Sequence, residues 1–104
     1  MYLPIAVQKQ PQINAAVSEL VKELYPAVQR VRYEIAPDWE GQWAIFFHVL
    51  LSDEASNRQN LREIVPRIMW SMTDKLNIPE IGMFPYFHFR SQSEQTQLPE
   101  PAWA

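Results

Sequence analysis

Hydrophobic residues recur along this chain with two different periods. Before residue 26 and again after residue 57, apolar side chains return every three or four positions, which is the spacing of one helix face. The first stripe comprises Ile13, Ala16, Val17, Leu20, Val21 and Leu24, and the second comprises Leu61, Ile64, Val65, Ile68, Met69, Met72 and Leu76. The two stripes predict two amphipathic helices.

Proline and capping residues predict where these helices begin and end. Pro11 suits a first helical turn, and Pro26 cannot continue a helix. Ser56 and Gln59 have the spacing of a capping box before the second helix. Pro66 lies inside the second stripe, so we expect either a kink there or a true helix start near residue 63.

Between and after the helices the pattern predicts strands. Residues 28–36 alternate apolar and charged side chains, which is typical of a half-buried strand. Residues 37–41 have turn composition, with Trp39 expected as a lid over the end of the core. The run 43–51 has one polar side chain, His48, and predicts a central strand covered on both faces. A third strand is expected at residues 86–90.

This order predicts an α+β fold. Helix, strand, strand, helix and strand form a two-layer sandwich when both helices cover one face of a three-stranded sheet. The most apolar strand, near residues 42–51, should be central. We expect an N-terminal arm at 1–10, one domain at 11–90, and a flexible C-terminal tail at 91–104 that is rich in Gln, Ser and Pro.

Composition narrows the class of function. The 104 residues fit one domain, and the absence of cysteine excludes disulfides, thiol catalysis and thiolate metal sites. A net charge of −3 argues against nucleic acid as a partner. The N-terminus lacks a signal-peptide pattern, and no segment approaches the roughly 20 apolar residues of a membrane span. We therefore expect a cytoplasmic protein without a cofactor.

The strands divide into two faces by parity. If Val31, Tyr33 and Ile35 face the helices, an apolar set in the other strands shares that face: Trp43, Ile45, Phe47, Val49, Leu51, Phe87 and Phe89. The opposite face then carries Arg30, Arg32, Glu34, Ala44, Phe46, His48, Leu50, Tyr86, His88 and Arg90. An uncovered patch of this kind exceeds what soluble monomers usually expose. Aromatic and arginine side chains are enriched at interfaces, so a protein partner is expected there. The alternative is that residues 1–7 or 98–103 fold over the face.

Two tryptophans extend this prediction. Trp70 lies about 180° from the apolar stripe of its helix on a helical wheel. Either a kink at Pro66 buries it, or it forms a second contact point for a partner. Trp103 is a candidate anchor in the tail. Both belong to the predicted partner-binding set with Arg30, Arg32, Phe46, His48, Leu50, Tyr86, His88 and Arg90.

Other chemistry on the same face stays open. Aromatic and arginine side chains on a sheet can stack unpaired bases, and the element order resembles ribosome-maturation and KH-like RNA modules, although the GXXG loop of KH domains is missing. His48, His88 and Glu34 could hold a metal ion in a small histidine-dependent enzyme or metal protein. Ser91 and Ser93 are not part of a nucleophile-elbow sequence. Asp53 and Glu54 precede the second helix, where negative charges are favoured by the helix dipole, so they need no catalytic role.

Several short motifs are spread along the chain after residue 36: Pro37-Asp-Trp-x-Gly41, Ala44-Ile-Phe-Phe47, Ser52-Asp-Glu-Ala55 and Phe84-Pro-Tyr-Phe-x-Phe-Arg-Ser-x-Ser-Glu94, with a closing Glu100-Pro-Ala-Trp-Ala104. In these motifs the chain resembles a group of small uncharacterised bacterial proteins with no established activity. Proteins of this sort are often one half of a two-gene module, including toxin–antitoxin pairs. The resemblance implies a non-enzymatic interaction module that binds a second copy, as a homodimer or larger homo-oligomer, or a cognate protein.

Overall fold

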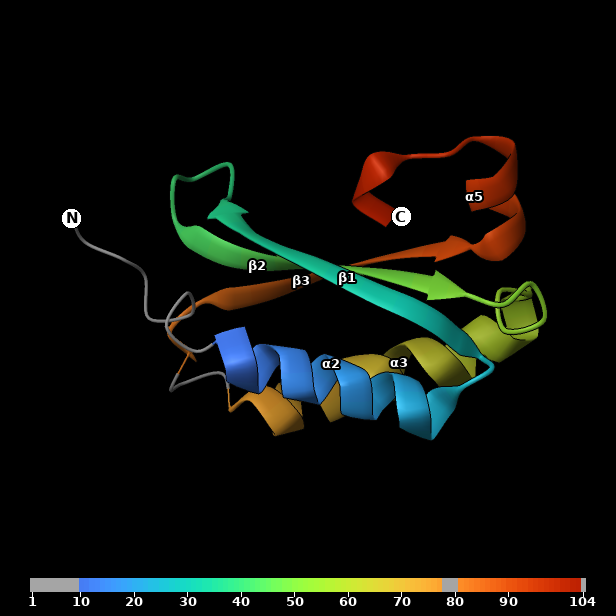
Figure 1. Ribbon diagram of the computed structural model, residues 1–104, viewed down its shortest axis with the longest axis horizontal. Coiled ribbons are helices and arrows are strands. Elements are labelled where there is room, and N and C mark those ends of the chain that lie inside the picture. The colour runs from blue at the N-terminus through green and yellow to red at the C-terminus, as the bar shows by residue number, and fades with distance from the viewer. Residues whose placement is uncertain (1–9, 78–80, 104) are drawn as a thin grey trace.

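The computed structural model describes residues 10–77 and 81–103, and the predicted N-terminal arm lies outside them except for Gln10. The chain order is α2 (Gln10–Leu24), β1 (Val28–Pro37), β2 (Trp43–Leu51), α3 (Arg58–Leu76), β3 (Phe84–Ser91), α5 (Gln92–Gln97) and the 3-10 turn η1 (Pro101–Trp103) (Figure 1). The predicted α+β fold and its element order are confirmed, with α5 and η1 added after the last strand.

The three strands lie in the order β1-β2-β3, which confirms β2 as the central strand. β1 and β2 pair antiparallel, and β2 and β3 pair parallel. The register sets Tyr33 opposite Phe47 and Phe47 opposite Phe87, so these residues share one face of the sheet. A register shift between Val28 and Arg30 lets Val28 join the core as well.

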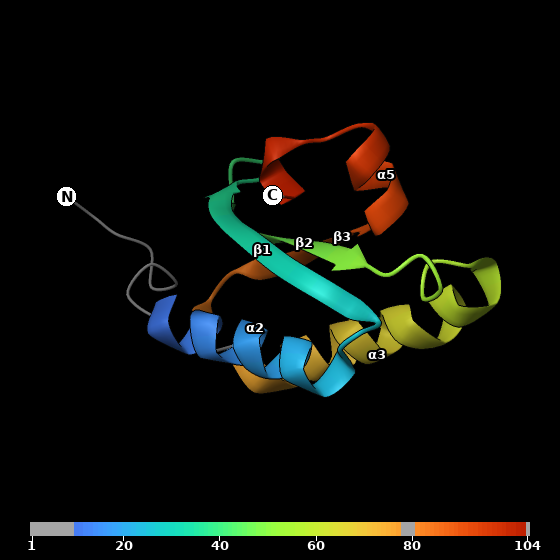
Figure 2. The ribbon, with the colours of Figure 1, turned by 45° about the vertical axis from the view of Figure 1, so that its right-hand side comes forward.

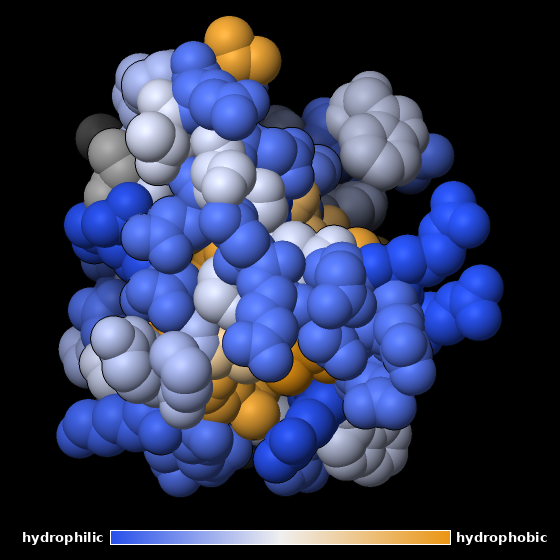
Figure 3. Space-filling view, turned by 90° about the vertical axis from the view of Figure 1, so that its right-hand side faces the viewer, coloured by the Kyte–Doolittle hydropathy of each residue, from blue (hydrophilic) through white to orange (hydrophobic). Residues whose placement is uncertain are grey.

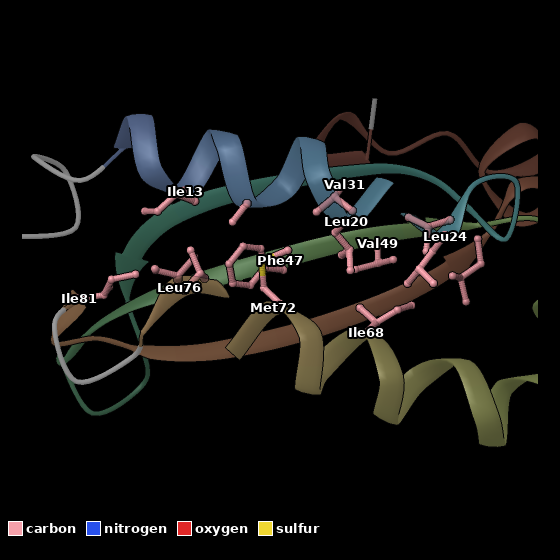
Figure 4. Packing of buried hydrophobic residues seen from close by; sticks show 14 of the residues in the cluster. Ile13, Leu20, Leu24, Val31, Phe47, Val49, Ile68, Met72, Leu76 and Ile81 are labelled. Atoms are coloured by element: carbon pink, nitrogen blue, oxygen red, sulfur yellow. The ribbon is translucent and has the colours of Figure 1, made fainter. Parts of the chain in front are cut away.

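Helices α2 and α3 cover one face of the sheet, and α5 and η1 lie on the other (Figures 1 and 2). Their apolar stripes meet the sheet in one core, shown in Figure 4. Its fully buried side chains include Ile13, Leu20, Phe47, Val49, Ile68 and Met72. Burying each such side chain contributes about 1.5–3 kcal/mol, so this packing is the main source of stability.

The start of α3 differs from the prediction. Asn57, rather than Ser56, is the N-cap, and its side chain accepts a hydrogen bond from the backbone N–H of Asn60 at 2.9 Å. The Ser56 hydroxyl instead donates to the carbonyl of Ser52 at 2.9 Å. The helix continues through Pro66, so a start near residue 63 is wrong. Within the described ranges, no helix is long and apolar enough to cross a membrane.

Three tryptophans lie differently from their predicted places. Trp39 is 79% exposed and is not a lid over the core, because its ring contacts Tyr86 on the face of the sheet away from the helices. Trp43 lies at the start of β2 and is half-exposed rather than buried with its strand. Trp70 is 77% exposed, so the interpretation that a kink at Pro66 buries it is wrong.

The C-terminal segment also differs from the predicted flexible tail. Ser91 and Glu94 form a capping box that starts α5, because the serine side chain and the glutamate side chain each bond the other residue's backbone N–H. Trp103, in η1, is only 8% exposed. This segment therefore packs against the sheet, as the alternative for residues 98–103 anticipated.

Candidate functional site

The face of the sheet away from α2 and α3, called the outer face here, gathers most of the predicted partner-binding residues. The register places Arg32 opposite His48 and His48 opposite His88. In the same way Phe46 lies opposite Tyr86, and Leu50 lies opposite Arg90 and Arg30. Trp103 joins these residues from η1, whereas Trp70 lies on α3, in the layer behind the sheet.

Ring contacts link the side chains of the outer face into one aromatic row. Its members, from the hairpin turn to the C-terminal segment, are Trp39, Phe84, Tyr86, Phe46, His88, His48 and Trp103. Neighbouring ring centroids lie between 5.0 Å, for His48 and Trp103, and 6.3 Å, for Phe46 and His88. The row follows β2 and β3 along their length and alternates between them, so it connects the hairpin turn with the C-terminal segment.

The chain itself covers one end of this row. The edge of Trp103 packs on His48, and the Arg30 Nη2 group donates to the Trp103 carbonyl at 3.0 Å. Leu50, which the parity pattern predicts on an open patch, is only 5% exposed. We call Arg30, His48, Leu50 and Arg90, with Trp103 above them, the covered half of the outer face.

Arg90 holds the C-terminal segment in place. Its buried guanidinium donates to the Gln95 Oε1 atom at 2.8 Å, to the Glu94 carbonyl at 3.2 Å and to the Leu98 carbonyl. The Leu98 carbonyl lies at the C-cap of α5, and the Glu94 carbonyl also accepts from the Leu98 backbone N–H at 2.9 Å, so Arg90 ties the end of α5 to β3. Arg90 is therefore structural in this arrangement rather than available to a partner.

Asp53 also fixes α5, which corrects its predicted role at the second helix. Its carboxylate accepts from the Ser93 backbone N–H at 2.9 Å and from the Ser93 hydroxyl. These two hydrogen bonds hold the pKa of the Asp53 carboxyl below its usual value. The acidic group thus stabilises the start of α5, where the helix dipole favours a negative charge.

His48 lies in the covered half, where its ring contacts His88 and Trp103. Both ring nitrogens are buried and have no hydrogen-bond partner among residues 10–77 and 81–103, although Glu34 Oε1 approaches Nε2 at 3.7 Å. His88 stacks on the ring with centroids 5.5 Å apart. His48 therefore has no hydroxyl to activate as a nucleophile in the described chain. The described histidine and acidic residues also form no group that could hold a metal ion, so the predicted triad of His48, His88 and Glu34 is not assembled.

The other end of the row is open to solvent. Trp39 is 79% exposed and Phe84 is 64% exposed, Phe46 and Tyr86 are half-buried, and His88 is exposed. We call Trp39, Phe46, Phe84, Tyr86 and His88 the uncovered half of the outer face. Trp39 and Phe84 were not among the predicted partner residues. Phe84 has the parity of Tyr86 and would have been included if the predicted strand had begun two residues earlier.

Asp38 orders this uncovered half. One carboxylate oxygen accepts from the backbone N–H groups of Glu40 and Gln42 at 2.9 and 3.0 Å, and the other accepts from the Tyr86 hydroxyl at 3.2 Å. Partial burial raises the pKa of the Tyr86 hydroxyl, and the negative charge of Asp38 raises it further. Asp38 thereby holds the turn that carries Trp39 against the strand that carries Tyr86.

A separate hollow of about 350 Å³ lies where β2 leads into α3, and Figure 3 shows apolar atoms between hydrophilic side chains at this end of the molecule. Ser52 and Asn60 line it, together with Glu54, Glu63 and Arg67. Ser52 Oγ accepts from the Ala55 backbone N–H, and the Asn60 amide donates to the Glu54 carbonyl. Both polar groups therefore already serve the turn, and the hollow adds no chemistry to the outer face.

The outer face offers contact groups: aromatic rings, guanidinium groups and carboxylates. Such a set suits the recognition of another molecule better than a bond-breaking reaction. Comparison of the chain with known protein families, with curated proteins and with solved structures finds no match.

Proposed function

We propose that this chain is a non-enzymatic protein-interaction module that holds a protein partner on the uncovered half of its outer face. The observation that carries the proposal is the exposure of Trp39 and Phe84 at one end of the outer face, whereas the chain buries Leu50 at the other end. Tryptophan and tyrosine contribute most of the binding energy at many interfaces. A partner that covers these rings removes from water a surface that soluble monomers seldom expose.

The order of the uncovered half favours tight binding. Asp38 fixes the turn and the Tyr86 hydroxyl, and Tyr86 contacts both Trp39 and Phe46, with ring centroids 5.3 and 5.2 Å apart. These rings are held before a partner arrives. Association therefore costs less side-chain entropy than it would on a mobile surface.

The same geometry favours protein over RNA as the partner. Phe46 and Tyr86 stack on each other with an angle of 15° between the rings, so part of each ring face that a base would need is occupied. The carboxylates of Asp38 and Glu40 raise the pKa of Tyr86 and would repel phosphate at the same place. A partner surface with apolar and basic side chains fits these groups better.

The test is purification of a tagged chain from its native cell, with the product of the neighbouring gene as the first partner to examine. Phe46→Arg places a charge in the uncovered half, and Thr73→Arg places the same charge on an exposed position of α3. We expect one protein to co-purify in equal amounts with wild type and Thr73→Arg and to be lost with Phe46→Arg. A second, untagged copy of the chain counts as that protein only when Phe46→Arg removes it. The proposal is overturned if no protein distinguishes the two variants while circular dichroism shows both folded.

A further inference from the structure

The two outer strands of the sheet differ in how their edges are protected. In the described part of the chain, β1 and β3 each have a strand neighbour only on the β2 side. β1 carries Arg30, Arg32 and Glu34 and ends at Pro37, and such charges and prolines discourage another strand from pairing. β3 carries one charge, Arg90, whose guanidinium is turned to the C-terminal segment. From Phe84 to Phe89, Pro85 is therefore the one residue of β3 that hinders another strand from pairing at this edge.

β3 is also incompletely covered on both of its faces. On the helix side, Phe87 and Phe89 stay partly exposed, although Phe47 and Val49, their register partners in β2, are fully buried. On the outer side, Tyr86 is half-buried and His88 is exposed. A partner that lay flat on the outer face would cover only one of these sides. A strand added at the edge, with side chains on both sides, covers both.

We infer that the outer edge of β3 pairs with β3 of a second copy, antiparallel about a two-fold axis at Phe87. The pairing joins two three-stranded sheets into one of six strands. Dimers with two-fold symmetry, in which the same surface of each copy meets, are the commonest homo-oligomers. This contact goes beyond the proposed function, because it lies at the strand edge and leaves Trp39 and Phe46 open for a protein partner.

The sequence of β3 is self-complementary about that axis. Residues 84–90 place three positions on each side of Phe87. Tyr86 lies opposite His88 of the second copy, and Phe84 lies opposite Arg90 of the second copy. Phe89 lies opposite Pro85 of the second copy, and the Arg90 guanidinium stays bound to its own C-terminal segment. Apolar and aromatic side chains thus make up most of the pairs, and no like charges face each other. The two uncovered halves then lie side by side on one broad face.

Light scattering after size exclusion, over a dilution series, tests the inference with two charge variants. We expect the wild type to have about twice the 12.2 kDa of one chain at high concentration. The double variant Tyr86→Glu with His88→Glu sets like charges opposite each other and should have the mass of one chain. The double variant Tyr86→Lys with His88→Glu sets opposite charges face to face and should keep the double mass. Phe46→Arg, on the central strand, should also keep it.

Hydrogen exchange of the β3 amides gives a second reading that needs no variant. We expect these amides to exchange about tenfold more slowly at high than at low protein concentration.

A wild type with the mass of one chain at every concentration overturns the inference. So does β3 protection that is independent of concentration, which would mean that the chain covers its own edge. A dimer that both charge variants leave intact, or that both abolish, overturns the register about Phe87. Loss of the partner in Phe46→Arg without loss of the dimer separates this contact from the proposed function.

Discussion

The covered and uncovered halves of the outer face share strands β2 and β3, yet their side chains meet different surroundings. Leu50 is 5% exposed beneath the C-terminal segment, whereas Phe46, four residues earlier in β2, remains half-exposed beside Tyr86 and His88. The segment that ends at Trp103 reaches His48 and reaches no further along the row. An apolar outer face therefore does not by itself indicate a partner, because the chain supplies its own cover for one half. The half that it leaves open is the informative one.

The largest expected difference between the halves comes from placing the same charge in each. Leu50→Arg puts a guanidinium where the chain has closed over the sheet, and we expect it to lower the free energy of unfolding by more than about 3 kcal/mol. The arginine of Phe46→Arg can extend into solvent, so we expect it to lower the free energy of unfolding by about 1 kcal/mol. Urea denaturation of both variants measures this contrast. Equal losses of unfolding free energy in the two variants would mean that the C-terminal segment does not cover one half more than the other.

Removing the cover itself should have the next largest effect. Trp103→Ala takes away the buried ring over His48, and we expect a loss of about 3 kcal/mol of unfolding free energy. Leu98→Ala is the matched control, because that side chain lies in the same segment and is exposed. We expect Leu98→Ala to lower the free energy of unfolding by less than about 0.5 kcal/mol. If Trp103→Ala costs no more than the control, the C-terminal segment does not stabilise the covered half.

The guanidinium of Arg90 should matter somewhat less. Arg90→Met keeps an apolar stem but leaves the carbonyls of Glu94 and Leu98 without this donor, so we expect a loss of about 2 kcal/mol. Arg62→Met on the exposed side of α3 should change the unfolding free energy by less than about 0.5 kcal/mol. Thermal and urea unfolding of the pair provide the measurement. A smaller loss at Arg90 than at Arg62 would contradict the structural role.

The smallest effect is expected in the uncovered half, at the hydroxyl of Tyr86. The pKa of this hydroxyl is raised in the folded chain, so its contribution to stability is present below pH 10 and is lost as the pH rises through the folded value. Tyr33 also has a raised pKa, because of burial, and shares this alkaline loss. Tyr86→Phe should therefore lessen the loss of stability at alkaline pH without abolishing it. An unchanged alkaline profile would contradict the raised pKa that burial and Asp38 together give the Tyr86 hydroxyl.

Much of the fold could be predicted because local periodicity reflects which side of each element is buried. Ile13, Leu20 and Met72 fall on the helix faces that their spacing predicts, and the parity of β2 places Phe47 inside and Phe46 outside. The choice of Asn57 over Ser56 as the N-cap was not predictable in this way, because both residue types cap helices well and they are adjacent.

The contacts that divide the outer face could not be predicted because they join distant parts of the chain. Arg30 and Trp103 are 73 positions apart, and Asp38 and Tyr86 are 48 positions apart. The composition of the C-terminal segment suggested a flexible tail, although Ser91 and Glu94 already had capping-box spacing that marks the start of α5. The exposure of Trp39 depends on where the hairpin turn lies relative to the helices, which periodicity does not specify.

The central claim, that a protein partner covers the uncovered half, is tested most directly by site-specific photo-crosslinking in the native cell. A photoreactive phenylalanine analogue at position 39 lies in the uncovered half, and the same analogue at position 73 lies on the exposed side of α3. We predict one discrete protein adduct from position 39, absent from position 73 and lost when Phe46→Arg is added. No adduct from position 39, or the same adduct from both positions, would contradict the claim.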